Sequence, residues 1–172
     1  VPVFAHPQAW VPKYARLPDG SYRDVGIPIS RQELEQMGAS FRLSAEPVRI
    51  TNDIMTTGEI PLVTDYEAVD PHLFIKTDGG AYVPDTIPDD QALIVQSEEG
   101  PVVVSGCAHR GIINTMLHAR KLTGQDIYMV IGGAHLLGAT EERVQLTITA
   151  LKDMNVQRIG VSHCTGLPAA AI

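Results

Sequence analysis

The chain has 172 residues, of which 44% are hydrophobic, and its formal net charge is −7. This hydrophobic content excludes a disordered chain, and the length suits one domain or a large part of one. The negative charge and the absence of any Lys/Arg run argue against a nucleic-acid backbone or an anionic membrane as the main partner. No apolar run reaches the ~20 residues that span a bilayer. No signal peptide is visible, so the default expectation is a cytoplasmic location.

The N-terminal part of the chain, residues 1–90, has weak periodicity, and we expect an irregular, pocket-lining region with short strands. Ser30 followed by Glu33 is a capping-box signal for a short helix that ends near Met37. The other expected elements are a buried strand at 1–4, a polar loop at 14–26, short strands at 41–43 and 47–50, and a long ordered excursion at 65–90.

The C-terminal part, residues 91–172, is regular and predicts the order β-β-α-β-α-β, in which the first two strands form a hairpin. Gly124 ends the first helix, and Thr140 caps the second. This half is therefore α/β, with helices packed on a sheet. The predicted strands are 91–96, 102–105, 127–131 and 158–161, and the predicted helices are 111–122 and 140–154.

Three of these strands run into turns of small residues, and each turn contains a histidine. The turns are residues 105–109 (SGCAH), 132–135 (GGAH) and 162–166 (SHCTG). In open α/β sheets, ligand and catalytic groups gather at the carboxyl ends of strands, where glycines let the backbone turn sharply. We therefore expect His109, His135 and His163 to converge, although they are far apart in the sequence.

Histidines in this arrangement are typical of a metal site, because imidazole nitrogen suits zinc, iron and manganese. A lone histidine in a turn is usually only a hydrogen-bonding or capping group, but three at successive strand ends favour a shared function. Cys107 and Cys164 are each expected to be small packed residues rather than ligands. Cys107 is the better ligand candidate of the two, because it directly follows its strand.

Other polar residues are weaker candidates for the site. Asp85, Asp89 and Asp90 form an acidic cluster just before the predicted hairpin. This cluster is either a solvated turn or a contact to metal or substrate. His6 precedes Pro7 in a turn, where it either lines the site or has a structural role.

The motifs together resemble a branch of the metallo-β-lactamase superfamily. This branch is related to the dihydropterin–ribofuranosylaminobenzene 5′-phosphate synthases of methanopterin biosynthesis. The resemblance covers nearly all of the chain. It is carried by residues 105–111 (SGCAHRG), Asn114, 132–136 (GGAHL) and 163–166 (HCTG), and upstream by 3–7, 57–60 and 84–93.

The resemblance implies an αββα sandwich whose N-terminal half carries an H-x-H-x-D-H motif, and this motif is absent from the sequence. We therefore interpret residues 1–172 as a single partial domain, the C-terminal part of such a sandwich. It would be incomplete, and inactive by itself, without an N-terminal half as its partner.

The resemblance also implies roles for individual residues. His163 corresponds to the last metal ligand, and Cys107 stands where many relatives carry a bridging aspartate, with His109 two residues further on as another ligand. His135 lies where phosphodiesterase-like relatives have a phosphate contact or general acid, so we assign it the catalytic role. The usual middle histidine ligand would fall near Asp89 or Asp90, so the number of metal ions is left open.

The function implied is that of a metal-dependent hydrolase or transferase acting through metal-activated water on a small, phosphorylated or pterin-like substrate. One or two divalent ions are expected, with zinc first and iron or manganese as alternatives. Asp90, Asp89 and His6 are the expected substrate contacts. Two other classes remain open: a non-catalytic metal- or ligand-binding sensor domain on the same fold, and a structural half of a split assembly.

Overall fold

The computed structural model describes all 172 residues, which form two compact units. The first unit comprises Val1–Ala45 and Val69–Asp89, and the second comprises Glu46–Ala68 and Asp90–Ile172. The predicted change from an irregular to a regular pattern after residue 90 thus lies next to the boundary between the two units, which falls between Asp89 and Asp90. Residues 46–68 had been grouped with the N-terminal part, but they pack with the second unit because their single strand pairs with its sheet.

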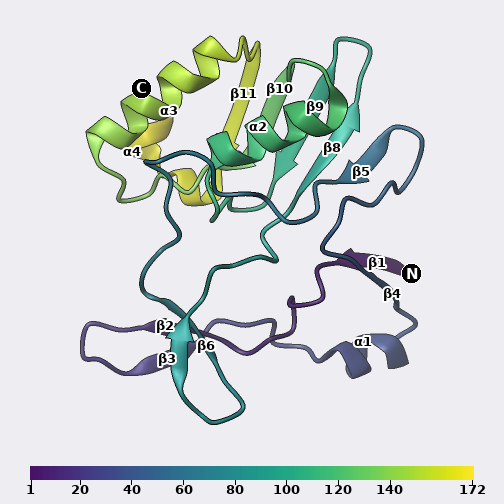
Figure 1. Ribbon diagram of the computed structural model, residues 1–172, viewed down its shortest axis with the longest axis vertical. Coiled ribbons are helices and arrows are strands. Elements are labelled where there is room, and N and C mark those ends of the chain that lie inside the picture. The colour runs from purple at the N-terminus through teal and green to yellow at the C-terminus, as the bar shows by residue number, and fades with distance from the viewer. The chain divides into compact units, whose positions relative to one another are not determined.

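The second unit is built on a five-stranded sheet of order β11-β10-β9-β8-β5 (Figure 1). β9, β10 and β11 are parallel to one another. β8 runs antiparallel to β9, and β5 runs antiparallel to β8. The predicted hairpin and the order β-β-α-β-α-β are confirmed. The strands are β5 (Ile54–Thr56), β8 (Ala92–Gln96), β9 (Pro101–Ser105), β10 (Met129–Gly133) and β11 (Arg158–Ser162).

Two helices, α2 (Ile112–Thr123) and α3 (Glu141–Asp153), cover one face of this sheet (Figure 1). As predicted, α2 ends at Gly124, which adopts a left-handed conformation with φ +68°. The Thr140 side chain accepts a hydrogen bond from the Arg143 amide and caps α3. The core between helices and sheet includes Val103, Ile113, Met116, Ala119, Val130 and Leu151.

The other face of the sheet is apolar and carries no helix of this unit. Because side chains alternate along a strand, the residues between the core positions point to this face. These residues are half-buried or exposed, and we call this surface the open face. It consists of Ile54, Leu93, Val95, Val102, Val104, Met129 and Ile131.

The first unit contains a two-stranded parallel sheet, a four-stranded antiparallel sheet and a short helix. The capping box predicted at Ser30 and Glu33 is present at the start of the helix. The elements are β1 (Pro2–Ala5), β2 (Lys13–Arg16), β3 (Tyr22–Asp24), α1 (Arg31–Gln36), β4 (Ser40–Leu43), β6 (Leu73–Lys76) and β7 (Tyr82–Pro84), and the larger sheet has the order β3-β2-β6-β7.

One expectation for this unit was wrong, because residues 14–26 are not a polar loop but contain the β2–β3 hairpin. The ordered excursion expected at 65–90 contains the β6–β7 hairpin, which was not predicted. The rings of Tyr22 and Tyr82 stack with centroids 3.7 Å apart, and Tyr22 also meets Phe74 edge to face at 5.3 Å. In the order β3-β2-β6-β7 these rings belong to strands that are not hydrogen-bonded neighbours, so the contacts stabilise the sheet from distant parts of the sequence.

Two strand predictions in the second unit also need correction. Residues 47–50 form no strand, because only Arg49 makes an isolated bridge, to Met55. The strand predicted at 127–131 begins two residues later, at Met129, and runs on through Gly133. The prediction began too early because Ile127, which precedes the strand, is an apolar, fully buried residue of the kind that strands contain.

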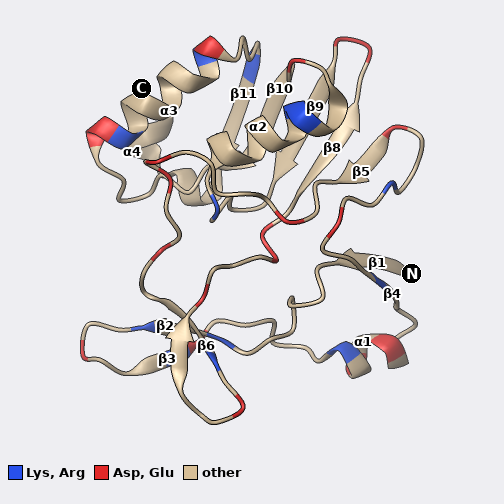
Figure 2. Cartoon of the chain, viewed as in Figure 1, with Lys and Arg blue, Asp and Glu red and all other residues tan.

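Charged side chains are scattered over both units (Figure 2). Acidic residues stand at the start of α3, where Glu141 and Glu142 lie in the first turn and interact favourably with the helix dipole. No helix of the chain has the length and hydrophobicity needed to cross a bilayer.

Candidate metal centre

The three histidine-containing turns leave the same edge of the sheet. Since β9, β10 and β11 are parallel and in register, with Ser105 beside Gly132 and Gly133 beside Ser162, their carboxyl ends coincide. Each turn contains a non-glycine residue with positive φ: Ala108 (+56°), His135 (+48°) and His163 (+54°). Such conformations cost on the order of 1 kcal/mol or more and cluster at functional sites.

A group of possible metal ligands forms at this edge. One ligand atom each from Cys107, His163 and Cys164 lies within 4.8 Å of the others. Both cysteines are half-buried and His163 is exposed, so the group is open to solvent on the histidine side. Two sulfurs and an imidazole nitrogen are the donors that zinc prefers.

Cys164 is the member of this group that sequence reasoning missed, since we expected a packed residue there. Its Sγ donates a hydrogen bond to the carbonyl oxygen of Cys107 at 3.2 Å. The signal that could have found it is its position directly after His163, in the same turn. The structure also brings together Cys107 and His163, both of which were predicted as ligands.

The absence of a side chain at Gly133 allows the first and third turns to approach each other. A Cβ atom there would lie 2.5 Å from the Gly106 carbonyl oxygen and 2.6 Å from Cys164 Sγ, closer than such atoms pack. The amide of Gly133 donates to the Gly106 carbonyl at 2.9 Å, and its own carbonyl accepts from Ser105 Oγ at 2.8 Å. The glycine predicted to permit a sharp turn therefore permits a close approach of two turns.

His109 lies against His135 rather than in the group with Cys107. The two imidazole rings have centroids 4.3 Å apart and are tilted by 53°. Ala108, in its left-handed conformation, separates His109 from Cys107 along the chain. The assignments of His109 as a ligand and His135 as a catalytic residue stay predictions.

The predicted substrate contacts belong to different units. Asp89 and His6 lie in the first unit and Asp90 in the second. Asp89 pairs with Lys13 at 2.7 Å, and Asp90 accepts a hydrogen bond from the Arg110 amide at 2.8 Å. His6 is buried, and its Nδ1 accepts from the Gln8 amide at 3.1 Å, whereas its Nε2 is buried without a partner.

Two of the groups named above have shifted pKa values: the Cys107 thiol in the possible ligand group, and the Lys13 ammonium, which pairs with Asp89. Burial raises the pKa of the Cys107 thiol to about 11, and the neighbouring Cys164 adds to the effect, so the thiol is neutral at pH 7. For Lys13, burial opposes the charge, but hydrogen bonds to Asp85 and Asp89 outweigh it and raise the pKa. Lys13 therefore stays charged and holds both carboxylates.

Asn114, part of the recognised motif, has a structural role. Its Oδ1 accepts hydrogen bonds from the amides of Val63 and Thr64, both at 2.9 Å. Glu67 lies beside it and accepts from the amides of Ile113 and Asn114 at the start of α2. These contacts fix the segment 46–68 to the helix that follows the first histidine-containing turn.

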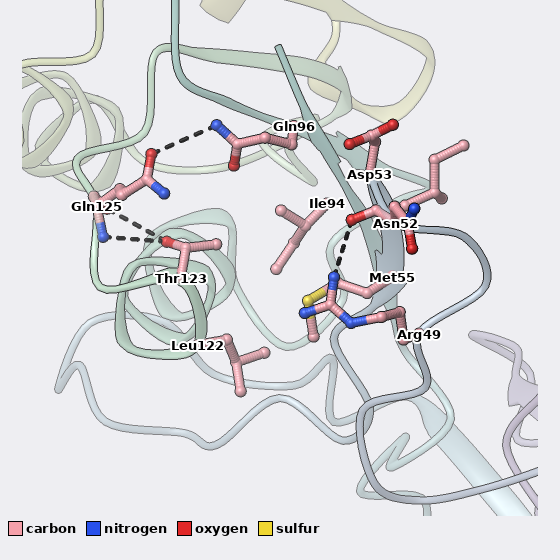
Figure 3. Close-up of a pocket in the computed structure, with 10 residues that line it drawn as sticks. Arg49, Asn52, Asp53, Met55, Ile94, Gln96, Leu122, Thr123 and Gln125 are labelled. Atoms are coloured by element: carbon pink, nitrogen blue, oxygen red, sulfur yellow. Dashed lines mark hydrogen bonds between the residues drawn. The ribbon is translucent and has the colours of Figure 1, made fainter. Parts of the chain in front are cut away.

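A separate cavity of about 440 Å³ lies at the other end of the strands, away from the histidine-containing turns (Figure 3). Gln96, one of its lining residues, pairs with Pro101 at the start of β9, whereas the histidines follow the strand ends. Gln96 donates to Gln125 at 3.4 Å, and Arg49 donates to the Asn52 carbonyl at 2.9 Å. Its lining contains neither histidine nor cysteine, so it is not part of the metal centre.

The fold and the site define a class of protein. A solved structure described as a metal-dependent hydrolase of the β-lactamase superfamily matches with a TM-score of 0.82 and 25% sequence identity. The match covers 99% of this chain and 62% of that chain. The α/β class and the resemblance to the metallo-β-lactamase superfamily are therefore confirmed. No family model matches the sequence.

One relative found by sequence carries the name of the branch that the motifs resemble. The chain is 34% identical to the 7,8-dihydropterin-6-methyl-4-(β-D-ribofuranosyl)-aminobenzene-5′-phosphate synthase of Methanocaldococcus jannaschii, over 98% of this chain and 58% of that protein. It is 31% identical to an uncharacterized protein of the same organism, over 97% and 59% respectively. The chain thus spans less than two thirds of the length of the relatives it matches.

Proposed function

We propose that the protein to which this chain belongs is a metal-dependent hydrolase or transferase acting on a small, phosphorylated or pterin-like substrate. The observation that carries the proposal is the group formed by Cys107, His163 and Cys164 at the carboxyl edge of the sheet. The names of one relative and one solved structure support it, since the first is named as the synthase of a dihydropterin–ribofuranosyl-aminobenzene phosphate and the second is described as a metal-dependent hydrolase.

The donor atoms present fit a divalent metal, and zinc fits them best because sulfur and imidazole are soft or borderline ligands. Cys107 and His163, which were predicted as ligands, would supply two of the four donors of a tetrahedral site. A metal ion held there would lower the pKa of bound water and polarise a phosphoryl oxygen. A second ion would need ligands from outside this group.

His135 is the residue we propose for proton transfer. It follows β10, the strand between the two that precede the ligand-bearing turns, and its ring packs on that of His109. Imidazole exchanges protons near pH 7, so His135 suits donation to a leaving oxygen, and His109 would hold the ring in place.

The remaining part of the sandwich is proposed to cover the open face. The relatives are longer than this chain, and the open face is a continuous apolar surface of the kind that another sheet covers. The proposed partner is a further segment carrying H-x-H-x-D-H, which would supply the ligands that this chain lacks.

Elemental analysis of the intact protein tests the proposal. Roughly one or two ions per chain are expected in the wild type. His163→Ala should lower this content, whereas His72→Ala, in the first unit, should not. Two assays would then identify the reaction: release of phosphate from a panel of phosphoesters, or transfer of a pterinylmethyl group from an ester to an aminobenzene phosphate, with the ester group released. A folded wild type without metal would refute the proposal.

A metal sensor without catalysis is the second candidate. It is favoured by the sulfur-rich donor set, because thiolates bind zinc tightly and reduce its Lewis acidity. Stoichiometric zinc in a protein that turns over none of the substrates in the panel would support this function and exclude the first.

A further inference from the structure

We propose that Cys164 is itself a metal ligand, so that Cys107, His163 and Cys164 form one thiolate-rich site. The inference rests on the proposed function in placing a metal at this edge of the sheet. It goes further by adding Cys164 to Cys107 and His163 as a ligand from this chain.

The distances require only a small closure. Zinc lies ≈ 2.3 Å from sulfur and ≈ 2.0–2.1 Å from nitrogen, so tetrahedral ligands are roughly 3.8 Å apart for two sulfurs and roughly 3.5 Å apart for sulfur and nitrogen. The three ligand atoms already lie within 4.8 Å of one another. Rotation about the χ1 torsion of Cys107 and Cys164 can supply the remaining ~1 Å.

Hydrogen bonds between the three turns hold these residues in place. The first turn is joined to β10 by the bond from the Gly133 amide to the Gly106 carbonyl at 2.9 Å. The third turn is joined to the second at two points. The Leu137 amide donates to the Cys164 carbonyl at 2.9 Å, and the Ala134 amide donates to Thr165 Oγ1 at 3.1 Å. The backbone of the three turns is therefore fixed by hydrogen bonds, and only the side-chain torsions of the ligands need to adjust.

The existing contact of Cys164 is easily given up. Its thiol donates to the Cys107 carbonyl, and S–H is a weak donor, so coordination would replace a weak hydrogen bond with a metal–sulfur bond. Gly133 leaves the space in which Cys164 Sγ lies. His163, held at φ +54°, is the exposed member and lies on the side from which solvent reaches the site.

Two thiolates and one imidazole also determine the choice of metal. Such donors favour zinc, and disfavour magnesium, calcium and manganese, which prefer oxygen ligands. The two thiolate charges would neutralise a divalent ion within the site. We therefore expect selective uptake of zinc over manganese from an equimolar mixture.

Cobalt(II) is the probe for the sulfur ligands. It would be added to the intact, reduced protein without oxygen, because thiolate-to-cobalt charge transfer absorbs in the near ultraviolet. We expect this band in the wild type, and about half its intensity in Cys164→Ser and in Cys107→Ser, each of which keeps one thiolate. His163→Ala should keep the band but bind cobalt more weakly, and His72→Ala should match the wild type.

The outcomes separate this inference from the proposed function. Cobalt bound with an undiminished near-ultraviolet band in Cys164→Ser would overturn the inference and leave a metal-dependent enzyme standing. A two-thiolate band in a protein without turnover would support the inference and refute the enzyme. Absence of both cobalt and zinc binding would overturn both.

A second measurement guards against misfolding of the variants. If circular dichroism shows that Cys164→Ser is unfolded, X-ray absorption at the zinc edge of the wild type counts the sulfur ligands directly. Two sulfurs at about 2.3 Å are expected. One sulfur, or none, would overturn the inference.

Discussion

Glu67 is a single side chain that joins two distant parts of the second unit. Its carboxylate accepts hydrogen bonds from the amides of Ile113 at 2.9 Å and Asn114 at 2.8 Å, and from the Thr64 hydroxyl at 3.2 Å. Glu67→Ala should lower the free energy of unfolding by about 2–4 kcal/mol, because it leaves two buried amides without acceptors. Glu67→Gln should lose less, since its amide oxygen still accepts. Urea denaturation measures both, and equal losses would contradict this explanation.

The ionisation of Glu67 also makes stability depend on pH. Burial raises its pKa above the ordinary value of 4.5, although hydrogen bonds and Arg143 partly oppose the shift. As the pH rises from about 4.5 to the raised folded-state pKa, the unfolded chain loses this proton before the folded one. The wild type should therefore lose stability relative to Glu67→Gln across this window, and the difference should be constant above it. A pH-independent difference would contradict the raised pKa.

Gly133 controls the geometry of the metal centre. In Gly133→Ala the new methyl group would meet the Gly106 carbonyl oxygen at 2.5 Å and Cys164 Sγ at 2.6 Å, so the turns must separate. We expect a loss of about 1–3 kcal/mol in stability and much weaker cobalt binding. Gly106→Ala is the matched control, because its methyl group meets no atom within 4 Å. Retention of wild-type cobalt affinity in Gly133→Ala would contradict the close approach of the turns.

At the scale of elements, α3 depends on an N-terminal cap, Thr140, that could be predicted from the sequence. Thr140 accepts from the Arg143 amide at 3.2 Å, and the helix buries Val144, Thr147 and Leu151. Thr140→Ala should lower the free energy of unfolding by about 1 kcal/mol, whereas Thr140→Ser should be close to neutral because it keeps the hydroxyl acceptor. Chemical denaturation of the two variants measures the difference, and an equal loss in both would point to the methyl group instead.

Elements whose signals are local could be predicted from the sequence, and elements that depend on distant partners could not. Gly124 and Thr140 mark the ends of α2 and α3 within the segments themselves. The β2–β3 and β6–β7 hairpins were missed because their stability comes from rings brought together by folding, such as Tyr22 on Tyr82. β10 was misplaced because its last residues are glycines, which have low strand propensity.

The candidate site likewise has features that could be predicted from the sequence and features that depend on contacts formed by folding. The convergence of the three turns follows from the rule that parallel strands end at one edge, so the proximity of the turns that carry Cys107 and His163 could be predicted, and their role as ligands stays a prediction. The approach of Cys164 depends on the missing side chain of Gly133 and on hydrogen bonds between turns, which no local pattern reveals. The contact between His109 and His135 likewise depends on the conformation of Ala108.

At the scale of the whole molecule, the open face is an apolar surface that we expect another part of the protein to cover. The five-stranded sheet has helices on one side only, and its other side presents Leu93, Val104 and Ile131 among other apolar residues. The relatives are longer, and this chain spans 58% and 59% of their lengths. An apolar surface of this kind associates with another one when its natural cover is missing.

The chain of residues 1–172, produced by itself, is therefore expected to self-associate through the open face. Ile131→Lys places a charge at the centre of this face and should shift the chain toward monomer without loss of helix content. Leu146→Lys, at a position of α3 that is 40% exposed, is the matched control and should leave association unchanged. Analytical ultracentrifugation over a range of concentrations measures the shift. A wild-type chain that stays monomeric throughout would mean that the open face needs no cover, and it would weaken the proposal that a second sheet completes the fold.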